Sequence, residues 1–161
     1  MLEIYTVSFF GHRKMESPFR LEEQLARVIR GLVKSKDYVE FLVGRNGEFD
    51  QLVSSLIRLV KRAEGGEKCS HTLVLPYESA ELRENRAAFD RYYDNIELFP
   101  GTDTAHFKAA IQMRNREMVD RSDLVAFYLE HDSGGAYQTY RYAKKQGKNV
   151  LLLSANNDRT D

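Results

Sequence analysis

Short apolar segments alternate with amphipathic helical segments along the chain, and this alternation constrains the fold more than any other feature. The apolar segments, rich in β-branched and aromatic side chains, are residues 2–9, 38–43, 71–75, 95–99, 123–129 and 149–153. Between them, apolar side chains recur at helical spacing, as Leu21, Leu25 and Ile29 do. Strands that alternate with helices form parallel sheets covered on both faces. We therefore expect a Rossmann-like three-layer α/β/α domain with a mostly parallel sheet of about six strands.

Length and charge narrow the domain organisation and the partners. The chain has 161 residues, the size of one domain, and no internal repeat or low-complexity linker divides it. We expect a single domain over residues 1–161, with the polar segment 154–161 as a frayed tail. The 24 basic and 24 acidic residues cancel, so no overall field attracts a polyanion. This balance ranks nucleic acid last among the candidate partners, and any anion site must be local.

The cysteine content and the N-terminal sequence bear on the compartment. Cys69 is the single cysteine, so no intramolecular disulfide can form, and no Cys/His cluster has metal-ligand spacing. The first ten residues lack a basic leader, and no apolar run reaches the length that spans a bilayer. We therefore expect a cytoplasmic protein with no metal site and no membrane partner.

Three polar or glycine-containing loops follow predicted strands and carry the candidate ligand-binding residues. These residues are Gly11, His12 and Arg13; Gly44, Asn46, Gly47, Glu48 and Asp50; and Ser133, Gly134, Gly135 and Thr139. The carboxyl ends of parallel strands meet at one edge of a sheet, where ligands bind. Glycine lets the backbone approach a phosphate closely, and the first amides of the following helix point at it. We expect the three loops to line one pocket.

Arg114 is the most informative single residue of the chain. At helical phase it falls in the middle of the apolar stripe formed by Phe107, Ile111 and Met118, which predicts that it is buried against the sheet. A buried guanidinium requires an anionic partner, either a ligand or an internal carboxylate. The candidate carboxylates are Asp50, Asp120 and Asp123.

The residues next to Arg114 differ in their expected positions. Arg116 falls on the opposite side of the same helix and is expected in solvent. Asn115 falls at the edge of the apolar stripe, so it joins the candidate ligand-binding residues.

The chain resembles the SLOG superfamily, named for the SMF/DprA and Lonely Guy proteins, and specifically its YpsA-like bacterial branch. The segments that carry the resemblance are 8–13, 44–50, 114–120 and 134–139. The resemblance implies a Rossmann-like fold that binds nucleotides or nucleotide-derived ligands at the glycine loops, with roles in signalling and phage defence. Together these segments extend over almost the whole chain.

The third loop departs from the Lonely Guy pattern, which is Pro-Gly-Gly-x-Gly-Thr-x-x-Glu with a catalytic glutamate. Here Ser133 replaces the proline, the spacing from Gly134-Gly135 to Thr139 is one residue longer, and the matching glutamate is missing. This departure shifts the expectation from a phosphoribohydrolase to a sensor or binding protein.

Three functions follow from these residues. The first is binding of a nucleotide-derived ligand (a mononucleotide, NAD or ADP-ribose) by a sensor or regulatory protein, with Arg114 carrying most of the anion recognition and no other cofactor. The first alternative is a nucleotide N-glycosidase, with Glu48 or Asp50 as the acidic group. The second is a protein-interaction module for cell division or phage defence. A homo-oligomer is compatible with all three.

Overall fold

The computed structural model describes residues 2–16, 18–99 and 107–153. Its strands are β1 (Ile4–Gly11), β2 (Tyr38–Val43), β3 (Cys69–Leu75), β4 (Asn95–Leu98), β5 (Leu124–Tyr128) and β6 (Val150–Leu153). Its helices are α1 (Leu21–Ser35), α2 (Glu48–Glu64), α3 (Ala80–Glu84), α4 (Arg86–Tyr92), α5 (Phe107–Asp120) and α6 (Gly135–Lys145). The expectations that lie outside the described residues are a helix cap at Ser17, a strand boundary at Pro100-Gly101, a cap at 102–104 and the tail at 154–161.

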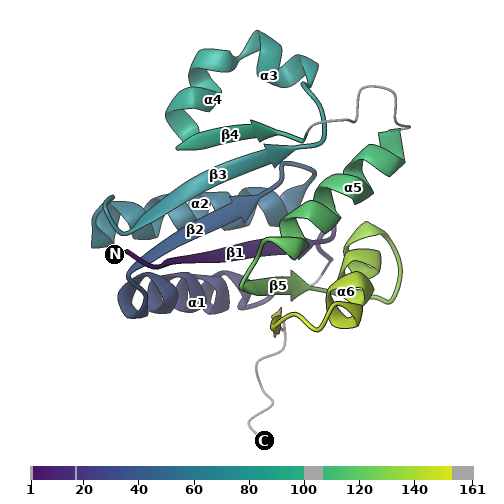
Figure 1. The fold of residues 1–161 in the computed structure, drawn as a ribbon, viewed down its shortest axis with the longest axis horizontal. Helices are drawn as coiled ribbons and strands as arrows, with labels where there is room; N and C mark the ends of the chain where they lie inside the picture. Colours follow the sequence, from purple (N-terminus) through teal and green to yellow (C-terminus); the bar gives the residue numbers. More distant parts are fainter. Residues whose placement is uncertain (1, 17, 100–106, 154–161) are drawn as a thin grey trace, which may run out of the picture.

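The six strands form one parallel sheet in the order β4-β3-β2-β1-β5-β6 (Figure 1). The chain builds the sheet outward from β1 in one direction through β4, and then adds β5 and β6 on the other side of β1. In such sheets the strand order reverses between two neighbours, and a crevice opens outside their carboxyl ends. Here the reversal lies between β1 and β5. The predicted α/β fold with a parallel sheet is confirmed.

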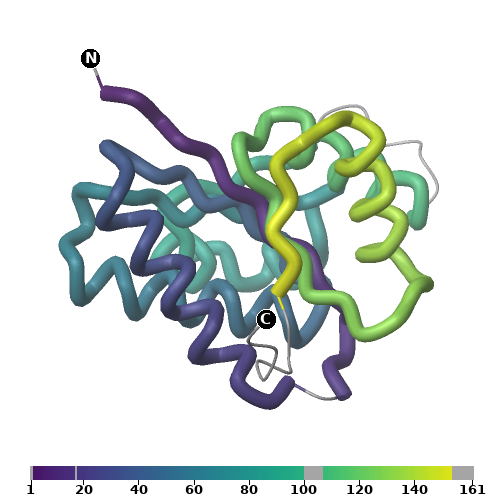
Figure 2. The backbone as a smooth tube through the Cα atoms, turned by 90° about the horizontal axis from the view of Figure 1, so that it is seen from below, coloured from purple at the N-terminus to yellow at the C-terminus, as the bar shows by residue number. Residues whose placement is uncertain are grey.

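Helices cover both faces of the sheet because side chains of the central strands point alternately to each face. On β1, Val7 and Phe9 belong to the core that includes α1 and α2, whereas Phe10 belongs to the core that includes α5 and α6. Figure 2 shows α1 and α6 on opposite sides of the strands. Burial on both faces explains why β1 reads as a continuous apolar run.

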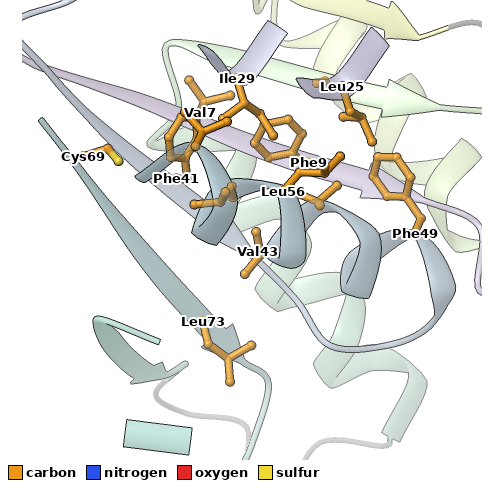
Figure 3. Packing of buried hydrophobic residues seen from close by; sticks show 14 of the residues in the cluster. Val7, Phe9, Leu25, Ile29, Phe41, Val43, Phe49, Leu56, Cys69 and Leu73 are labelled. Atoms are coloured by element: carbon orange, nitrogen blue, oxygen red, sulfur yellow. The ribbon is translucent and has the colours of Figure 1, made fainter. Parts of the chain in front are cut away.

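The larger core lies between the sheet and the pair α1 and α2 (Figure 3). Leu25 and Ile29 of α1 point at Phe9 of β1, as their helical spacing predicts. Phe49, at the start of α2, is fully buried in this core. The core therefore holds the first turn of α2 against the sheet, next to the carboxyl end of β1.

Several boundaries differ from the sequence expectations for local reasons. The sequence from 81 to 93 predicts one helical segment, but it forms α3 and α4, which meet at Asn85. Pro18 is suited to the first position of a helix, yet α1 begins at Leu21, after Arg20 with a left-handed φ of 63°. Ser79 is suited to a helix N-cap, and its hydroxyl accepts a hydrogen bond from the third residue of α3.

The apolar face of α5 is shorter than expected. Phe107 is 52% exposed and lies 5.8 Å, between ring centroids, from Tyr77 in the loop after β3. Met118 is fully buried against the sheet, three turns further along the helix. The first turn of α5 therefore projects beyond the sheet. Within the described ranges, no helix is both long and apolar enough to cross a membrane.

Candidate functional site

A cavity of about 810 Å³ opens at the carboxyl edge of the sheet, where the strand order reverses. We call it the sheet-edge cavity. Its walls are the loops after β1, β2 and β5 together with one face of α5. The polar and glycine residues that line it are Gly11, His12, Arg13, Lys14, Glu16, Gly44, Asn46, Gly47, Asp50, Lys108, Gln112, Arg114, Asn115, His131, Gly134, Gly135 and Gln138. The three loops that were expected to share one pocket therefore lie around one cavity.

Three of the candidate ligand-binding residues do not line the cavity. Glu48 is exposed, and its carboxylate accepts a hydrogen bond from the Met15 amide at 2.8 Å. Ser133 is exposed and bonds to the His131 ring at 3.1 Å. Thr139 is buried behind the cavity wall. These three side chains hold the loops in place, so the candidate acidic group Glu48 points away from any molecule in the cavity.

Close packing explains two of the glycines. A Cβ atom at Gly11 would lie 2.3 Å from Cγ of Phe49, so β1 can end against α2 only without a side chain there. A Cβ atom at Gly47 would lie 2.5 Å from the backbone of Arg13. That contact accompanies a hydrogen bond of 2.8 Å from the Glu48 amide to the Arg13 carbonyl. The loop after β1 is thus fastened to the start of α2, and the Arg13 side chain is left in solvent.

Arg114 is 2% exposed, as its helical phase predicts, and two of its nitrogens donate hydrogen bonds to protein atoms. Its Nη1 donates to the Val74 carbonyl at 2.7 Å, and its Nε donates to Oδ1 of Asn115 at 2.9 Å. Asn115 in turn donates to the Thr139 hydroxyl at 3.1 Å, which donates to the Gly135 carbonyl at 2.9 Å. This Arg114 network joins β3, α5 and α6 across the floor of the cavity.

Of the three carboxylates considered as internal partners of Arg114, Asp50 is the one that interacts with it electrostatically. A Cβ atom at Gly44 would lie 3.1 Å from both Nη1 of Arg114 and Oδ2 of Asp50, so both groups crowd the same backbone. Burial raises the pKa of Asp50, while the Asn46 amide, which donates at 2.8 Å, and Arg114 act to lower it. Burial lowers the pKa of Arg114, and Asp50 acts against that shift.

The other two candidate carboxylates for Arg114 have different partners. Asp120 accepts a hydrogen bond from the Tyr142 hydroxyl at 2.7 Å, and Asp123 accepts one from the Thr6 amide at 2.8 Å. Arg116 is exposed, as expected, and its guanidinium lies 5.0 Å from the centre of the Tyr142 ring. The geometry therefore gives Arg114 a positioning role in the floor of the cavity.

His12 fastens the loop after β1 to the loop after β5. Its Nε2 accepts a hydrogen bond of 2.8 Å from the Glu130 amide, so Nε2 carries no proton and the ring is neutral. The ring stacks on His131 with centroids 3.9 Å apart and planes 14° apart. Burial, followed by the charge of His131, lowers the pKa of His12. The Glu130 carboxylate accepts from the Glu16 amide at 2.9 Å, which makes a second tie between the two loops.

Positive charge gathers at the rim of the cavity although the whole chain is neutral. Arg13 and Lys14 are exposed, and no carboxylate lies within ion-pair distance of either among the described residues. Lys108 is exposed on the first turn of α5. With φ of 90° at Gly134, the chain turns directly into α6, whose first amides have no intrahelical partner. Together with Arg114, the described residues of the lining supply four cations against the carboxylates of Glu16 and Asp50.

Sequence reasoning missed several lining residues on α5 and in the loops. Lys108 and Gln112 lie one turn apart and on the same face as Asn115, a spacing that could have identified them. Lys14 directly follows Arg13 and belonged to the same loop. His131 gave no signal of its own, because its position depends on the contact with His12.

No protein-family model and no curated protein matches this chain. Two solved structures do match it. One is DNA processing protein A from Helicobacter pylori, in a structure that concerns its single-stranded DNA binding mode; the TM-score is 0.65 and the identity 16%, over 98% of this chain and 68% of that one. The other, the X-ray structure of DNA processing protein A (DprA) from Streptococcus pneumoniae, gives a TM-score of 0.67 and 17% identity, over 97% of this chain and 52% of that one.

The fold is similar to that of one part of DNA processing protein A. At this identity the likeness shows the fold alone, and this chain spans about half to two thirds of the two DprA chains. DprA proteins belong to the SLOG superfamily, so this chain shares its fold with members of the superfamily that its sequence resembles. The two matches do not test the finer assignment to the YpsA-like branch, which stays a prediction.

The DprA likeness overturns the expectations about partner and activity. One of the two structural neighbours, DNA processing protein A from Helicobacter pylori, has a single-stranded DNA binding mode, which fits neither a small nucleotide ligand nor N-glycosidic hydrolysis. The predictions of a small nucleotide-derived ligand, of N-glycosidic hydrolysis and of nucleic acid as the last-ranked partner are therefore wrong. The ranking of nucleic acid was wrong because a net charge of zero is a sum over the whole surface. A nucleic acid strand interacts mainly with the cations within a Debye length of its path.

Proposed function

We propose that this chain binds single-stranded DNA along the sheet-edge cavity. The observation that carries the proposal is the rim of exposed cations, Arg13, Lys14 and Lys108, contributed by two different elements around one opening. Proteins that bind single strands combine a positive groove for the phosphates with π faces for the bases. The DprA fold supports the same conclusion.

The lining divides into groups suited to phosphates and groups suited to bases. Arg13, Lys14 and Lys108 are flexible cations for the phosphodiester backbone, and the first amides of α6 add donors at a positive helix end. Phe107 is 52% exposed and lines the cavity. It offers a face on which a base can stack. Gln112, on the same side of α5, offers both a donor and an acceptor to base edges.

The binding should depend strongly on salt, because the contacts are few and electrostatic. Each neutralised phosphate of a single strand changes the slope of log K against log salt by about 0.7. Removal of Arg13 and Lys14 should therefore flatten the slope by roughly 1.4 and weaken binding roughly 20-fold at about 0.1 M salt.

The test is fluorescence anisotropy with a labelled oligothymidylate of about 20 nucleotides, a length that exceeds one binding site of this kind. The variant is Arg13→Gln with Lys14→Gln, and the control is Arg27→Gln with Arg30→Gln, which removes the same charge from the exposed face of α1. We expect the first pair to weaken binding and the second to leave it within about twofold. Equal effects of the two pairs would refute a specific site at the cavity.

We also propose that residues 1–161 form a single domain of the YpsA-like branch. The support is the continuous sheet that joins the described residues and the loop sequences at 8–13 and 44–50. Limited proteolysis should leave one resistant core that contains both β1 and β6, and two separable cores would contradict the proposal. Sedimentation at several concentrations tests the homo-oligomer, which stays a prediction.

A further inference from the structure

A second cleft, of about 350 Å³, lies between the C-terminal half of α2 and the end of α4. We call it the α2–α4 cleft, and its lining residues are Arg58, Lys61, Arg62, Gly66, His71, Arg91, Tyr92 and Asp94. It shares no residue with the sheet-edge cavity. Along α2, Arg58 is the cleft residue nearest to Asp50 of the cavity, and the helix between them is roughly 12 Å long at 1.5 Å per residue.

The α2–α4 cleft holds more positive charge than its lining neutralises. Of the five charged side chains among the described residues that line it, Asp94 is the one carboxylate, and it forms an ion pair with Lys61. Arg62 and Arg91 are exposed, with no ion pair to a carboxylate in the part of the chain that the structure describes. Three arginines therefore face the cleft without a counter-charge, since Arg58 has no carboxylate partner there either.

Arg58 is held in place without loss of its charge. Its guanidinium lies 4.2 Å from the centre of the Tyr92 ring. A ring face orients an arginine and leaves its N–H groups available for an anion. Tyr92 and its neighbour Tyr93 pack edge to face, with centroids 4.9 Å apart. The aromatic wall thus fixes one cation of the cleft before any ligand arrives.

His71 lines the same cleft with a buried ring. The side chain is 1% exposed, and Nε2 bonds to the Ser54 hydroxyl at 2.9 Å. Among the described residues Nδ1 has no hydrogen-bond partner, and it is the single buried side-chain nitrogen or oxygen of which this is true. Burial lowers the pKa of His71 to about 4; Asp94 and the Tyr92 backbone act in the opposite direction. The ring is therefore neutral at pH 7, and the positive charge of the cleft comes from the arginines.

We propose that the α2–α4 cleft is a second anion site, which binds a phosphate group through Arg58, Arg62 and Arg91. The planar guanidinium matches the oxygens of a phosphate in pairs, and three of them around one cleft favour a polyvalent oxyanion over a carboxylate. Stabilisation of the α2 dipole explains basic residues in its last turn, such as Lys61 and Arg62. The same role at the end of α4 accounts for Arg91, but neither helix end accounts for Arg58, which precedes the last turn of α2.

Two sources present the same phosphate chemistry, a free oxyanion and the phosphodiester backbone of a nucleic acid strand. Two measurements separate them. Calorimetric titration with inorganic pyrophosphate reports the free anion, and anisotropy with the labelled oligothymidylate reports the strand. The variant is Arg62→Gln with Arg91→Gln, both exposed. The control is again Arg27→Gln with Arg30→Gln on α1.

We expect the Arg62 and Arg91 pair to lose at least tenfold in affinity in one measurement and the control pair to change it less than twofold. A loss with pyrophosphate alone identifies a free anion, and a loss with oligothymidylate, with a salt slope flatter by about 1.4, identifies a strand. Absence of binding of either probe by the wild type, or equal binding by variant and control, overturns the proposal. If the pair fails to fold, Arg91→Gln alone on the short α4 replaces it.

This test separates the second site from the strand site proposed at the sheet-edge cavity. A chain whose Arg13 and Lys14 variant binds oligothymidylate normally, but whose Arg62 and Arg91 variant does not, has its strand site at the α2–α4 cleft. The reverse result, together with unchanged pyrophosphate binding by the Arg62 and Arg91 variant, refutes the second site and keeps the first. If both sites bind the strand, losses in the combined variant should multiply, since sites more than about 10 Å apart act additively in free energy.

Discussion

Replacement of Arg114 by methionine tests the positioning role of the Arg114 network. Methionine keeps much of the volume and removes the charge and the donors. The Val74 carbonyl then loses its bond of 2.7 Å, and Oδ1 of Asn115 loses its bond of 2.9 Å. Two buried acceptors without partners cost about 1–3 kcal/mol each in the usual range. The Asp50 carboxylate also loses its nearest interior cation.

The expected total is about 3–4 kcal/mol of unfolding free energy, inside the range that two unpaired buried acceptors give. For a chain of 161 residues this corresponds to a fall in Tm of roughly 6–15 °C. Urea denaturation followed by circular dichroism measures the change in free energy, and the slope with urea checks that the compactness of the unfolded state is unaltered.

A double-mutant cycle isolates the Asp50 contribution to the loss at Arg114. We expect Arg114→Met combined with Asp50→Asn to be less destabilised than the sum of the two single variants by about 1 kcal/mol or more, because the asparagine leaves no uncompensated charge. Strict additivity, or a loss below about 1 kcal/mol for Arg114→Met alone, would refute the view that Arg114 holds the floor of the cavity together.

Two further predictions concern Gly47 and His71. In Gly47→Ala the new Cβ would lie 2.5 Å from the Arg13 backbone, so denaturation should show a loss of about 1–3 kcal/mol. The control Gly31→Ala meets no atom within 4 Å and should gain up to about 1 kcal/mol from helix propensity, so equal losses would contradict the packing argument. His71 has a folded pKa of about 4, below its unfolded value, so stability present above about pH 6.5 is lost as pH falls towards 4, by up to about 3 kcal/mol. His71→Gln should flatten this part of the pH profile of unfolding free energy, and an unchanged profile would exclude His71 as its source.

Much of the fold follows from local sequence patterns because burial and periodicity act on neighbouring residues. The second strand, Tyr38–Val43, has the expected bounds, and the helical phase of α5 correctly placed Arg114 inside and Arg116 outside. The helical phase also predicted that Phe107 is buried, because Phe107 lies on the same face as Met118, but Phe107 is exposed. Helical phase cannot show where the sheet beneath a helix ends.

Features of the site that depend on contacts between distant segments could not be predicted in the same way. Lys14 and Lys108 line one opening, although 94 positions separate them in the chain (108 minus 14). The outward turn of Glu48 depends on its bond to the Met15 amide, which no spacing in the sequence records. The partner was wrongly predicted for a related reason, since composition counts charges without their positions.

Because of the Arg114 network, the floor of the sheet-edge cavity tolerates amino-acid substitutions less well than the rim does. A substitution at Asn115 or Thr139 breaks bonds that also join α5 to α6, so altered recognition there carries a loss of folding stability. Arg13 and Lys14 are exposed, and substitutions at such positions usually shift stability by less than about 0.5 kcal/mol. Related chains with this floor can therefore diverge in what they bind by exchanging rim residues while the framework beneath stays the same.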